Sequence, residues 1–156
     1  MQNIHVTAPL FIIGLAIRTT NENNQAAIDI PTLWSDFHSQ QIKTRIPNLV
    51  NDNIYAIYTD YESDFTASYT TIIGCQVHSL ASIPSGMVAH TIPSGSYTKI
   101  VAQGNLMDNI VLNEWIKIWN TPDYPRAYTS DFEVYGPKAQ DPNQAEVEIY
   151  LAIQSC

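Results

Sequence analysis

The sequence has little positive charge. Its 156 residues contain 15 Asp and Glu against 7 Lys and Arg, for a formal net charge of −8, and no Lys or Arg occurs between Ile46 and Thr98. Phosphate binding requires clustered positive charge, so we expect no direct nucleic-acid partner. An acidic field favours cations, although net charge describes solubility and steering rather than a binding site.

Cysteine and long apolar runs are also scarce. Cys75 and Cys156 offer neither a disulfide framework nor metal-ligand spacing, so we expect two reduced thiols. The histidines show no HxH or HExxH spacing, and the sequence has no P-loop, dinucleotide glycine pattern or GxSxG turn, so no metal, cofactor or catalytic residue is assigned. The apolar stretch Pro9–Ile17 is too short to cross a membrane and lacks signal-peptide flanks. We therefore expect a cytoplasmic protein without a membrane contact.

What is present is an order of elements that occurs twice. The first set is a strand, a helix and two strands at Phe11–Arg18, Thr32–Lys43, Ile54–Tyr61 and Ala67–Val77. After Ser85 and Gly86 the same order returns at Met87–Val101, Leu106–Trp119, Asp131–Tyr135 and Glu146–Ile153. This repetition predicts an α+β fold, a tandem βαββ repeat with pseudo-two-fold symmetry, in which antiparallel sheets and two helices surround a central ligand groove.

The length suits one domain, and a chain of this size buries roughly 70% of its unfolded surface in a single core. We expect that domain to span residues 1–156, with the first unit at about 4–82 and the second at about 85–156. Gly14, within the first strand, predicts a bulge or a close approach of two backbones.

Short motifs along the chain occur in a specific order. Tyr58-Thr59-Asp60-Tyr61 precedes a strand with a central Gly74, and the second half contains Ile83–Met87, Ile92–Tyr97, a Trp-bearing helix, Asp131–Tyr135 and Val147–Leu151. In this order they resemble the GyrI-like superfamily, the small-molecule-binding domains attached to AraC-type and MerR-type multidrug-responsive transcription regulators. The resemblance covers essentially the whole chain. Because the expected domain begins within the first ten residues, it implies a stand-alone form, with a separate protein partner as one mode of action.

The resemblance implies that Glu133 lies at the floor of an aromatic pocket, with Tyr135 in the same motif, and meets cationic ligands. A buried carboxylate is costly unless it is paired, and a lipophilic cation supplies the missing charge while aromatic faces add cation–π attraction. The alternative is a solvent-facing Glu133 on an edge strand. Glu148 and Tyr150 share one face of the closing strand and are the second pair of candidates; the alternative for them is a surface Glu and a rim Tyr.

Aromatic side chains are the remaining candidates for the groove. Tyr55, Tyr58, Tyr69 and Tyr97 suit its wall, because each combines an apolar ring with a polar tip, although ordinary sheet packing explains any one of them equally well. Trp115 is expected either in the core or along the groove. Trp34 and Trp119 are expected in the core.

The sequence thus favours a non-enzymatic protein that binds amphipathic, cationic small molecules. Two alternatives stay open. Some relatives of the resembled family open strained electrophilic compounds with a Glu and a Trp, which would assign hydrolysis to Glu133 and Trp115. Others shield a topoisomerase from toxins, and an acidic surface that mimics DNA charge is compatible with that role.

Overall fold

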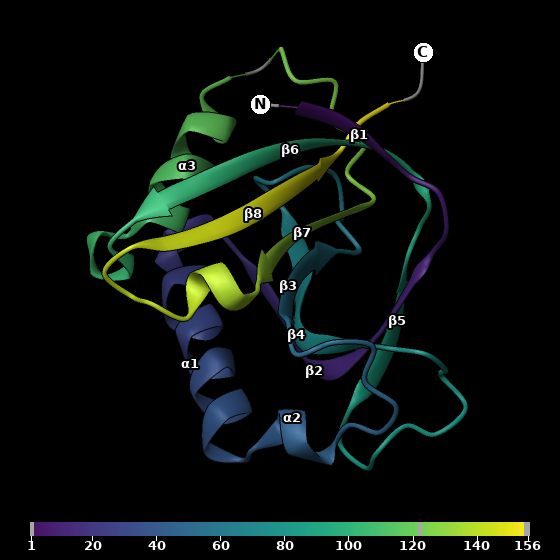
Figure 1. The fold of residues 1–156 in the computed structure, drawn as a ribbon. Coiled ribbons are helices and arrows are strands. Elements are labelled where there is room, and N and C mark those ends of the chain that lie inside the picture. The colour runs from purple at the N-terminus through teal and green to yellow at the C-terminus, as the bar shows by residue number, and fades with distance from the viewer. Residues whose placement is uncertain (1, 122, 155–156) are drawn as a thin grey trace.

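The computed structural model describes residues 2–121 and 123–154, and Figure 1 shows how its elements are arranged. The first half contains β1 (Gln2–Val6), β2 (Leu10–Thr20), the 3-10 helix η1 (Glu22–Asn24), α1 (Ala26–Ser39), α2 (Ile42–Arg45), β3 (Ile54–Thr59) and β4 (Ser68–Val77). The second half contains β5 (Val88–Ile92), β6 (Gly95–Gly104), η2 (Leu106–Asp108), α3 (Ile110–Trp119), β7 (Ser130–Tyr135), η3 (Pro137–Ala139) and β8 (Ala145–Ala152). The predicted α+β repeat is therefore confirmed.

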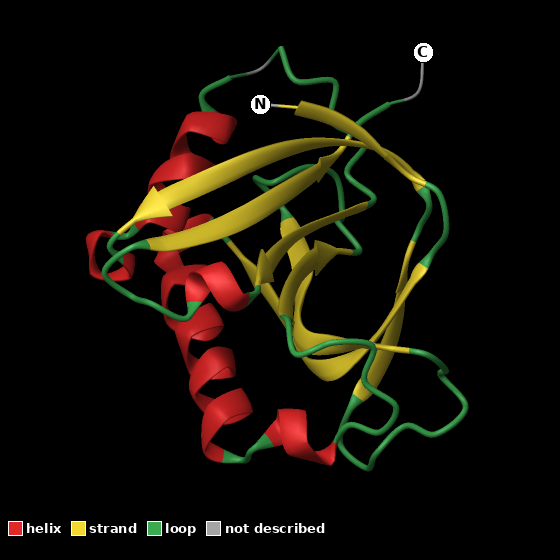
Figure 2. Ribbon diagram, in the orientation of Figure 1, coloured by secondary structure: helices red, strands yellow, loops and turns green. Residues whose placement is uncertain are grey.

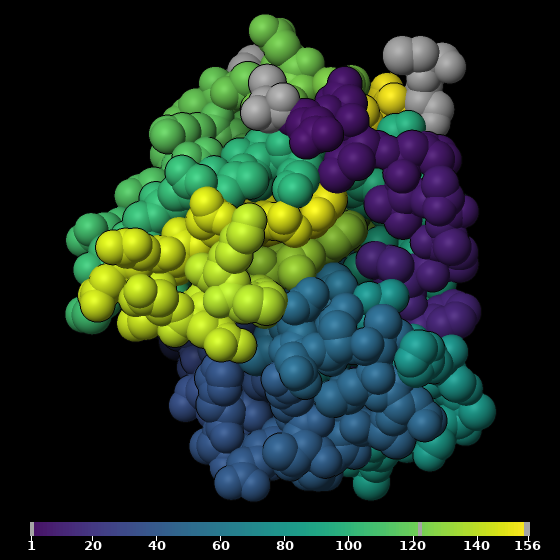
Figure 3. All heavy atoms as spheres, in the orientation of Figure 1, coloured from purple at the N-terminus to yellow at the C-terminus, as the bar shows by residue number. Residues whose placement is uncertain are grey.

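All of these strands belong to one antiparallel sheet with the order β1-β6-β8-β7-β3-β4-β2-β5. The two units meet at the central pair of β7 and β3, and on either side each strand has its counterpart at the same distance from that pair. The edge strands are exchanged, because β1 pairs with β6 of the second unit and β5 pairs with β2 of the first. In Figure 3 the N-terminal segment, coloured purple, accordingly lies against the second unit. The pseudo-two-fold symmetry thus acts within one continuous sheet.

The structure corrects two of the expected elements. The strand expected at Met87–Val101 is divided into β5 and β6, because Pro93 lacks a backbone donor and Gly95 adopts a φ of 150°. The helix expected at Thr32–Lys43 begins at Ala26, with Pro31 inside it, because the apolar stripe continues toward the N-terminus. It ends at Ser39, and a separate α2 follows because Gln41 adopts a left-handed φ of 50°. Strand β1 was not expected, since its exposed, polar sequence carries no apolar pattern.

The helices cover one face of the curled sheet, as Figure 2 shows, and each forms a core with its own unit. Helix α1 buries Leu33 and Phe37 against the first unit, and α3 buries Trp115 and Ile118 against the second. The opposite face holds a third core cluster that includes Ile12, Tyr55, Ile57, Ile92, Tyr97 and Phe132. Because that cluster joins side chains from strands far apart in the sheet, the sheet curls around it.

Two glycines allow β2 and β4 to approach closely. Gly14 and Gly74 face each other in the register of these strands. A Cβ at Gly14 would collide with the backbone carbonyl oxygen of Ile73, and a Cβ at Gly74 would collide with that of Ile13. The close approach expected at Gly14 is therefore confirmed.

Other features of the described residues bear on location and redox chemistry. None of the helices in residues 2–121 and 123–154 has the length and apolar character needed to cross a bilayer. Cys75 is a buried free thiol, and burial raises its pKa to about 11, which makes it a poor nucleophile at neutral pH. Cys156 lies outside the described residues.

We predict that Gly14→Ala lowers the free energy of unfolding by about 1–3 kcal/mol, because backbone atoms must move to admit the methyl group. Denaturant titration of the variant and the wild type measures the loss. Gly136→Ala is the matched control, since the nearest atom to its new Cβ is a side-chain oxygen of Asn53 at 2.9 Å, which can rotate away. Equal stability of the two variants would contradict the close approach.

Candidate functional site

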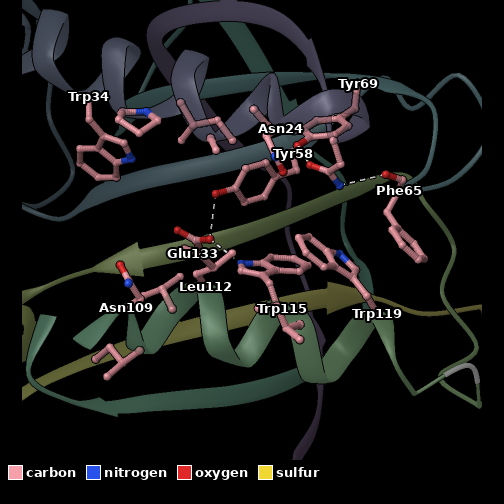
Figure 4. Close-up of a pocket in the computed structure, with 18 of the residues that line it drawn as sticks. Asn24, Trp34, Tyr58, Phe65, Tyr69, Asn109, Leu112, Trp115, Trp119 and Glu133 are labelled. Atoms are coloured by element: carbon pink, nitrogen blue, oxygen red, sulfur yellow. Dashed lines mark hydrogen bonds between the residues drawn. The ribbon is translucent and has the colours of Figure 1, made fainter. Parts of the chain in front are cut away.

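A cavity of about 930 Å³ lies between α1 and α3 on the helical face of the sheet. Figure 4 shows its aromatic lining around Glu133, with Trp34 at one end and Phe65 and Trp119 at the other. Strands β3, β4 and β7 supply the floor, the two helices supply the walls, and Arg126 and residues of the connecting loops complete the lining. The lining includes Ala26, Ile30, Trp34, Tyr58, Tyr61, Phe65, Tyr69, Leu106, Ile110, Leu112, Trp115, Trp119, Arg126, Glu133 and Tyr135.

The position of Glu133 follows from the register of the central strands. Glu133 on β7 faces Ala56 on β3, and side chains directly opposite each other share a face of the sheet. Tyr135 and Tyr58 lie two residues beyond this pair on their respective strands, so they point to the same face. The carboxylate is therefore placed at the centre of the cavity floor, where Glu133 is only 1% exposed.

Three neutral groups hold the Glu133 carboxylate. Tyr58 Oη donates to Oε2 at 2.8 Å, Trp115 Nε1 donates to the same oxygen at 2.6 Å, and Tyr135 Oη donates to Oε1 at 2.6 Å. In the part of the chain that the structure describes, no Lys, Arg or His forms an ion pair with Glu133. Its hydrogen bonds are satisfied, but its charge has no partner.

This arrangement changes the titration of the whole cluster. Burial raises the pKa of Glu133, and the hydrogen bonds from Tyr135, Trp115 and Tyr58 only partly offset the increase. Burial, and then the charge of Glu133, raise the pKa values of Tyr58 and Tyr135 well above the ordinary value for a phenol. Both hydroxyls therefore stay protonated at neutral pH and remain donors to the carboxylate.

A tryptophan packs against each of these tyrosines. Trp115 of α3 meets Tyr58 edge to face at 5.4 Å between ring centroids and 80°, and Trp34 of α1 meets Tyr135 at 4.9 Å and 75°. The carboxylate thus lies between two Trp–Tyr pairs. At the end of the pocket away from Trp34, Phe65 and Trp119 stack at 5.7 Å with 9° between their planes (Figure 4).

A second buried carboxylate lies beside the pocket. Arg126 Nη2 forms an ion pair with Asp131 Oδ2 at 2.6 Å, and the two side chains are 5% and 0% exposed. Tyr61 Oη donates to the same carboxylate at 2.6 Å, and the backbone N–H of Ala152 donates to Oδ1 at 2.8 Å. The guanidinium carbon lies 4.3 Å from the centroid of the Tyr128 ring. Unlike Glu133, Asp131 has a full counter-charge.

The structure brings together five of the predicted site residues and separates four from them. Glu133, Tyr135, Trp115, Tyr58 and Tyr69 all line the cavity. The other four, Tyr55, Tyr97, Glu148 and Tyr150, have their contacts on the opposite face or in its core.

The register of β7 and β8 explains where Glu148 and Tyr150 point. Glu133 faces Ile149, so the residues on either side of Ile149 project to the other face. There Tyr150 stacks on Phe132 at 4.6 Å and donates to Glu148 at 2.9 Å, and Glu148 pairs with Lys99 at 2.9 Å. These two residues do share one face, but it is not the face of the cavity.

The two tyrosines are accounted for by hydrogen bonds outside the cavity. Tyr55 Oη donates to the side-chain oxygen of Gln76 at 3.0 Å, and Tyr97 Oη donates to the backbone carbonyl of Pro93 at 2.7 Å. Both rings pack in the cluster that the curled sheet encloses. Their apolar bodies and satisfied hydroxyls fit ordinary core packing.

Several lining residues differ from the sequence-based expectation. Trp34 and Trp119, expected in the core, are half-buried and line the cavity while packing one side against a core cluster. Sequence reasoning missed Phe65, which lies in a loop, and Arg126, which lies between α3 and β7 without a periodic pattern. Among the residues that the structure describes, no group of three His, Cys, Asp or Glu is arranged to hold a metal ion.

Comparison with known proteins gives three kinds of match. Residues 5–153 match the family model Cass2, described as integron-associated effector binding protein. YobU of Bacillus subtilis (strain 168), a candidate transcriptional regulator, is 29% identical over 144 residues, which cover 90% of each chain.

Two solved structures are also similar. The integron cassette protein VCH_CASS2, from the mobile metagenome of Vibrio cholerae, has a TM-score of 0.74 and 31% identity, covering 98% of this chain and 95% of that one. The protein SAV2435, solved with bound tetraphenylphosphonium, has a TM-score of 0.78 and 17% identity, covering 99% of this chain and 93% of that one. At 17% identity, the second match establishes a shared fold.

We predict that Glu133→Gln stabilises the ligand-free protein at pH 7 by on the order of 1 kcal/mol, because it removes a buried charge that has no partner. Glutamine keeps the contacts, since its carbonyl accepts from Trp115 and Tyr58 and its amide donates to Tyr135. Because the folded pKa of Glu133 is raised, the native state binds a proton more readily than the unfolded chain. Wild-type stability therefore falls as pH rises from the unfolded pKa through the folded one.

Thermal unfolding across this pH interval measures the effect, and the Gln variant should lack this component of the fall. Glu148→Gln is the control with the opposite sign. Burial raises the pKa of Glu148, but its contacts with Lys99 and Tyr150 outweigh burial and lower that pKa overall. Its contribution is present above the unfolded pKa and is lost as pH falls. A lower unfolding midpoint for Glu133→Gln at pH 7 would show that the three donors outweigh the cost of burial.

Proposed function

The chain belongs to the Cass2 family of integron-associated effector-binding proteins, and we propose that it binds an amphipathic, lipophilic cation in the cavity around Glu133. The observation that supports this proposal is the environment of the Glu133 carboxylate. It is 1% exposed, it accepts three hydrogen bonds from neutral donors, and no cation pairs with it among the described residues. A cationic ligand would supply the one interaction that the site lacks.

The chemistry of the cavity lining favours the binding of a lipophilic cation. Ionised Glu133 in a cavity of about 930 Å³ has lost most of its hydration, so a diffuse cation, which is itself weakly hydrated, replaces that hydration at low cost. The walls supply apolar contact at about 25 cal/mol per Å² of apolar surface removed from water. Binding therefore combines charge pairing at the floor with apolar burial along the helices.

The two Trp–Tyr pairs suit a ligand with aromatic or branched apolar groups. Each tryptophan meets the ring of its tyrosine close to a right angle, and all four aromatic residues line the cavity. A ring face attracts a cation by about 0.5–2 kcal/mol when the charge is well placed over it. Rigid aromatic walls also lose little conformational entropy when a ligand binds.

The comparisons support binding as the task of this fold. The matched family is described by effector binding, and SAV2435, which shares the fold, was solved with tetraphenylphosphonium. YobU is a candidate transcriptional regulator, so we assign the binding to effector recognition, by sensing through a partner protein or by sequestration. Tetraphenylphosphonium is the first probe to use.

We predict that Glu133→Gln weakens the binding of tetraphenylphosphonium roughly ten- to a hundredfold, the range expected for a charged interaction of about 1.5–3 kcal/mol. Calorimetric titration measures the affinity, and tetraphenylborate, with nearly the same shape and the opposite charge, tests the sign. The wild type should bind the cation and not the anion. Glu148→Gln should change the affinity much less, because this carboxylate faces away from the cavity and pairs with Lys99.

The same titration should depend on pH although the probe does not titrate. Affinity for tetraphenylphosphonium should fall as pH drops through the raised pKa of Glu133, because only the carboxylate form pairs with a cation. The Gln variant should lose that dependence. Equal affinity of the wild type for the cation and the borate would show that binding is purely apolar and does not depend on the charge of Glu133.

Hydrolysis is the second candidate, and one observation favours it. Glu133 has a raised pKa and contacts Trp115 at 2.6 Å, so it is a buried acid that can exchange a proton with a ligand. Against it, the lining supplies no activated nucleophile among the described residues.

We predict that ester-bearing or strained ligands are recovered unchanged after incubation with the protein, as judged by mass spectrometry. The control is the same incubation with the Glu133→Gln variant. Turnover by the wild type that disappears in this variant would make hydrolysis the primary function.

A further inference from the structure

Two acidic side chains lie side by side on β7 and face the same side of the sheet. Asp131 and Glu133 are two residues apart, and they are 0% and 1% exposed. Two ionised carboxylates this close and this deeply buried repel each other unless one is neutralised. The surroundings of the pair show which one is neutralised.

Arg126 neutralises Asp131 in a one-to-one pair. Its Nη2 lies 2.6 Å from Asp131 Oδ2, and its Nε and Nη1 have no acceptor among the described residues. No second carboxylate therefore competes for this guanidinium within that part of the chain. With Glu133 ionised, the three charges sum to −1, and the unpaired charge belongs to Glu133.

Through Arg126, the ion pair reaches the cavity. Arg126 is one of its lining residues, and its guanidinium carbon lies 5.9 Å from the ring centroid of Trp115. The same indole donates its N–H to Glu133 at 2.6 Å. One tryptophan thus lies between a free negative charge and a positive charge that faces the same space, so a ligand seated on Trp115 experiences both.

We propose that the Arg126–Asp131 pair sets the net charge of the pocket at −1 and so makes it a site for monocations and not for dications. The inference rests on the proposed function. One cationic centre pairs with Glu133, whereas a second centre on the same ligand finds no unpaired carboxylate, because Asp131 already pairs with Arg126. In a low-dielectric cavity a cationic centre that loses its hydration without a counter-charge is far more costly than in water. Arg126 is a specificity-determining residue, and Asp131 is a positioning residue that acts through it.

The test is a charge series built from two conservative substitutions. Asp131→Asn keeps the shape and leaves Arg126 unneutralised, which brings the pocket to a net charge of 0. Arg126→Gln removes the positive charge and brings it to −2 at a pH at which Asp131 stays ionised, and the double variant returns it to −1; the series is therefore measured at a pH above neutral. The probes are benzyltriphenylphosphonium, the dication p-xylylenebis(triphenylphosphonium), and neutral triphenylphosphine oxide. Calorimetry measures each affinity, and thermal unfolding verifies that each variant is folded.

Asp131→Asn should weaken binding of the monocation on the order of tenfold although Glu133 is intact, because an unneutralised charge of the same sign now faces the ligand. The affinity for the neutral oxide should change by much less. A purely structural role of Asp131 would instead lower the affinities for the monocation and the oxide alike. Adding Arg126→Gln to Asp131→Asn should recover most of the lost affinity. Arg126→Gln alone should shift the ratio of dication to monocation affinity toward the dication by about tenfold.

Parallel loss of the cation and the oxide in Asp131→Asn, or no recovery in the double variant, would overturn the charge-balance role. If Asp131→Asn does not fold, the ratio of dication to monocation affinity is measured in Arg126→Gln and in the double variant instead. A ratio in Arg126→Gln that equals the wild-type ratio overturns the inference. Different results would contradict the two proposals, the binding of cations and the charge balance set by the Arg126–Asp131 pair. A wild type that binds the oxide as tightly as the monocation contradicts cation binding itself, whereas failure of the series alone leaves that binding intact.

Discussion

The buried charge of Glu133 is the constraint on which the site depends. A carboxylate that is 1% exposed must find hydrogen bonds inside the protein, and it takes them from a strand of each unit and from a helix. Because all three donors are neutral, the carboxylate is held in place without being neutralised. The protein thereby retains an electrostatic cost in its ligand-free state, and the proposed cationic ligand would relieve it, which would couple affinity to a loss of intrinsic stability.

The donors also connect the two βαββ units. Tyr58 of the first unit packs against Trp115 of the second, and Tyr135 of the second packs against Trp34 of the first. Each Trp–Tyr pair therefore crosses the boundary between units, and Glu133 joins the two pairs by hydrogen bonds. A ligand in the cavity touches both units at once, so its binding energy bears on how firmly they are held together.

How far the sequence predicts this structure depends on the kind of signal. The duplicated order of elements follows from sequence patterns, which are local properties, whereas the facing of Glu133 and Tyr135 is implied by the family resemblance and the strand pattern alone leaves it open. The facing of Glu148 and Tyr150 depends on the register between β7 and β8, and a shift of one residue reverses every side chain. Trp34, Trp119 and Phe65 show a second limit, since an amphipathic stripe or a loop does not reveal whether a helix face meets the core or an open cavity. The pairing of Arg126 with Asp131 depends on tertiary contact alone, although the two residues are close in sequence.

The symmetry of the fold and the asymmetry of its charges are linked. Position 56 on β3 faces position 133 on β7, beside the pseudo-two-fold axis, and it is alanine where its counterpart is glutamate. A second carboxylate there would lie directly opposite Glu133, where like charges are destabilising and one of them would have to bind a proton. Alanine at position 56 leaves room in the cavity and leaves Glu133 without a second carboxylate opposite it. The other carboxylate on this face, Asp131, is tolerated because Arg126 pairs with it. A symmetric cradle of aromatic side chains can therefore hold one negative charge at its centre, and a single charge suits a ligand that carries one positive charge within a bulky apolar body.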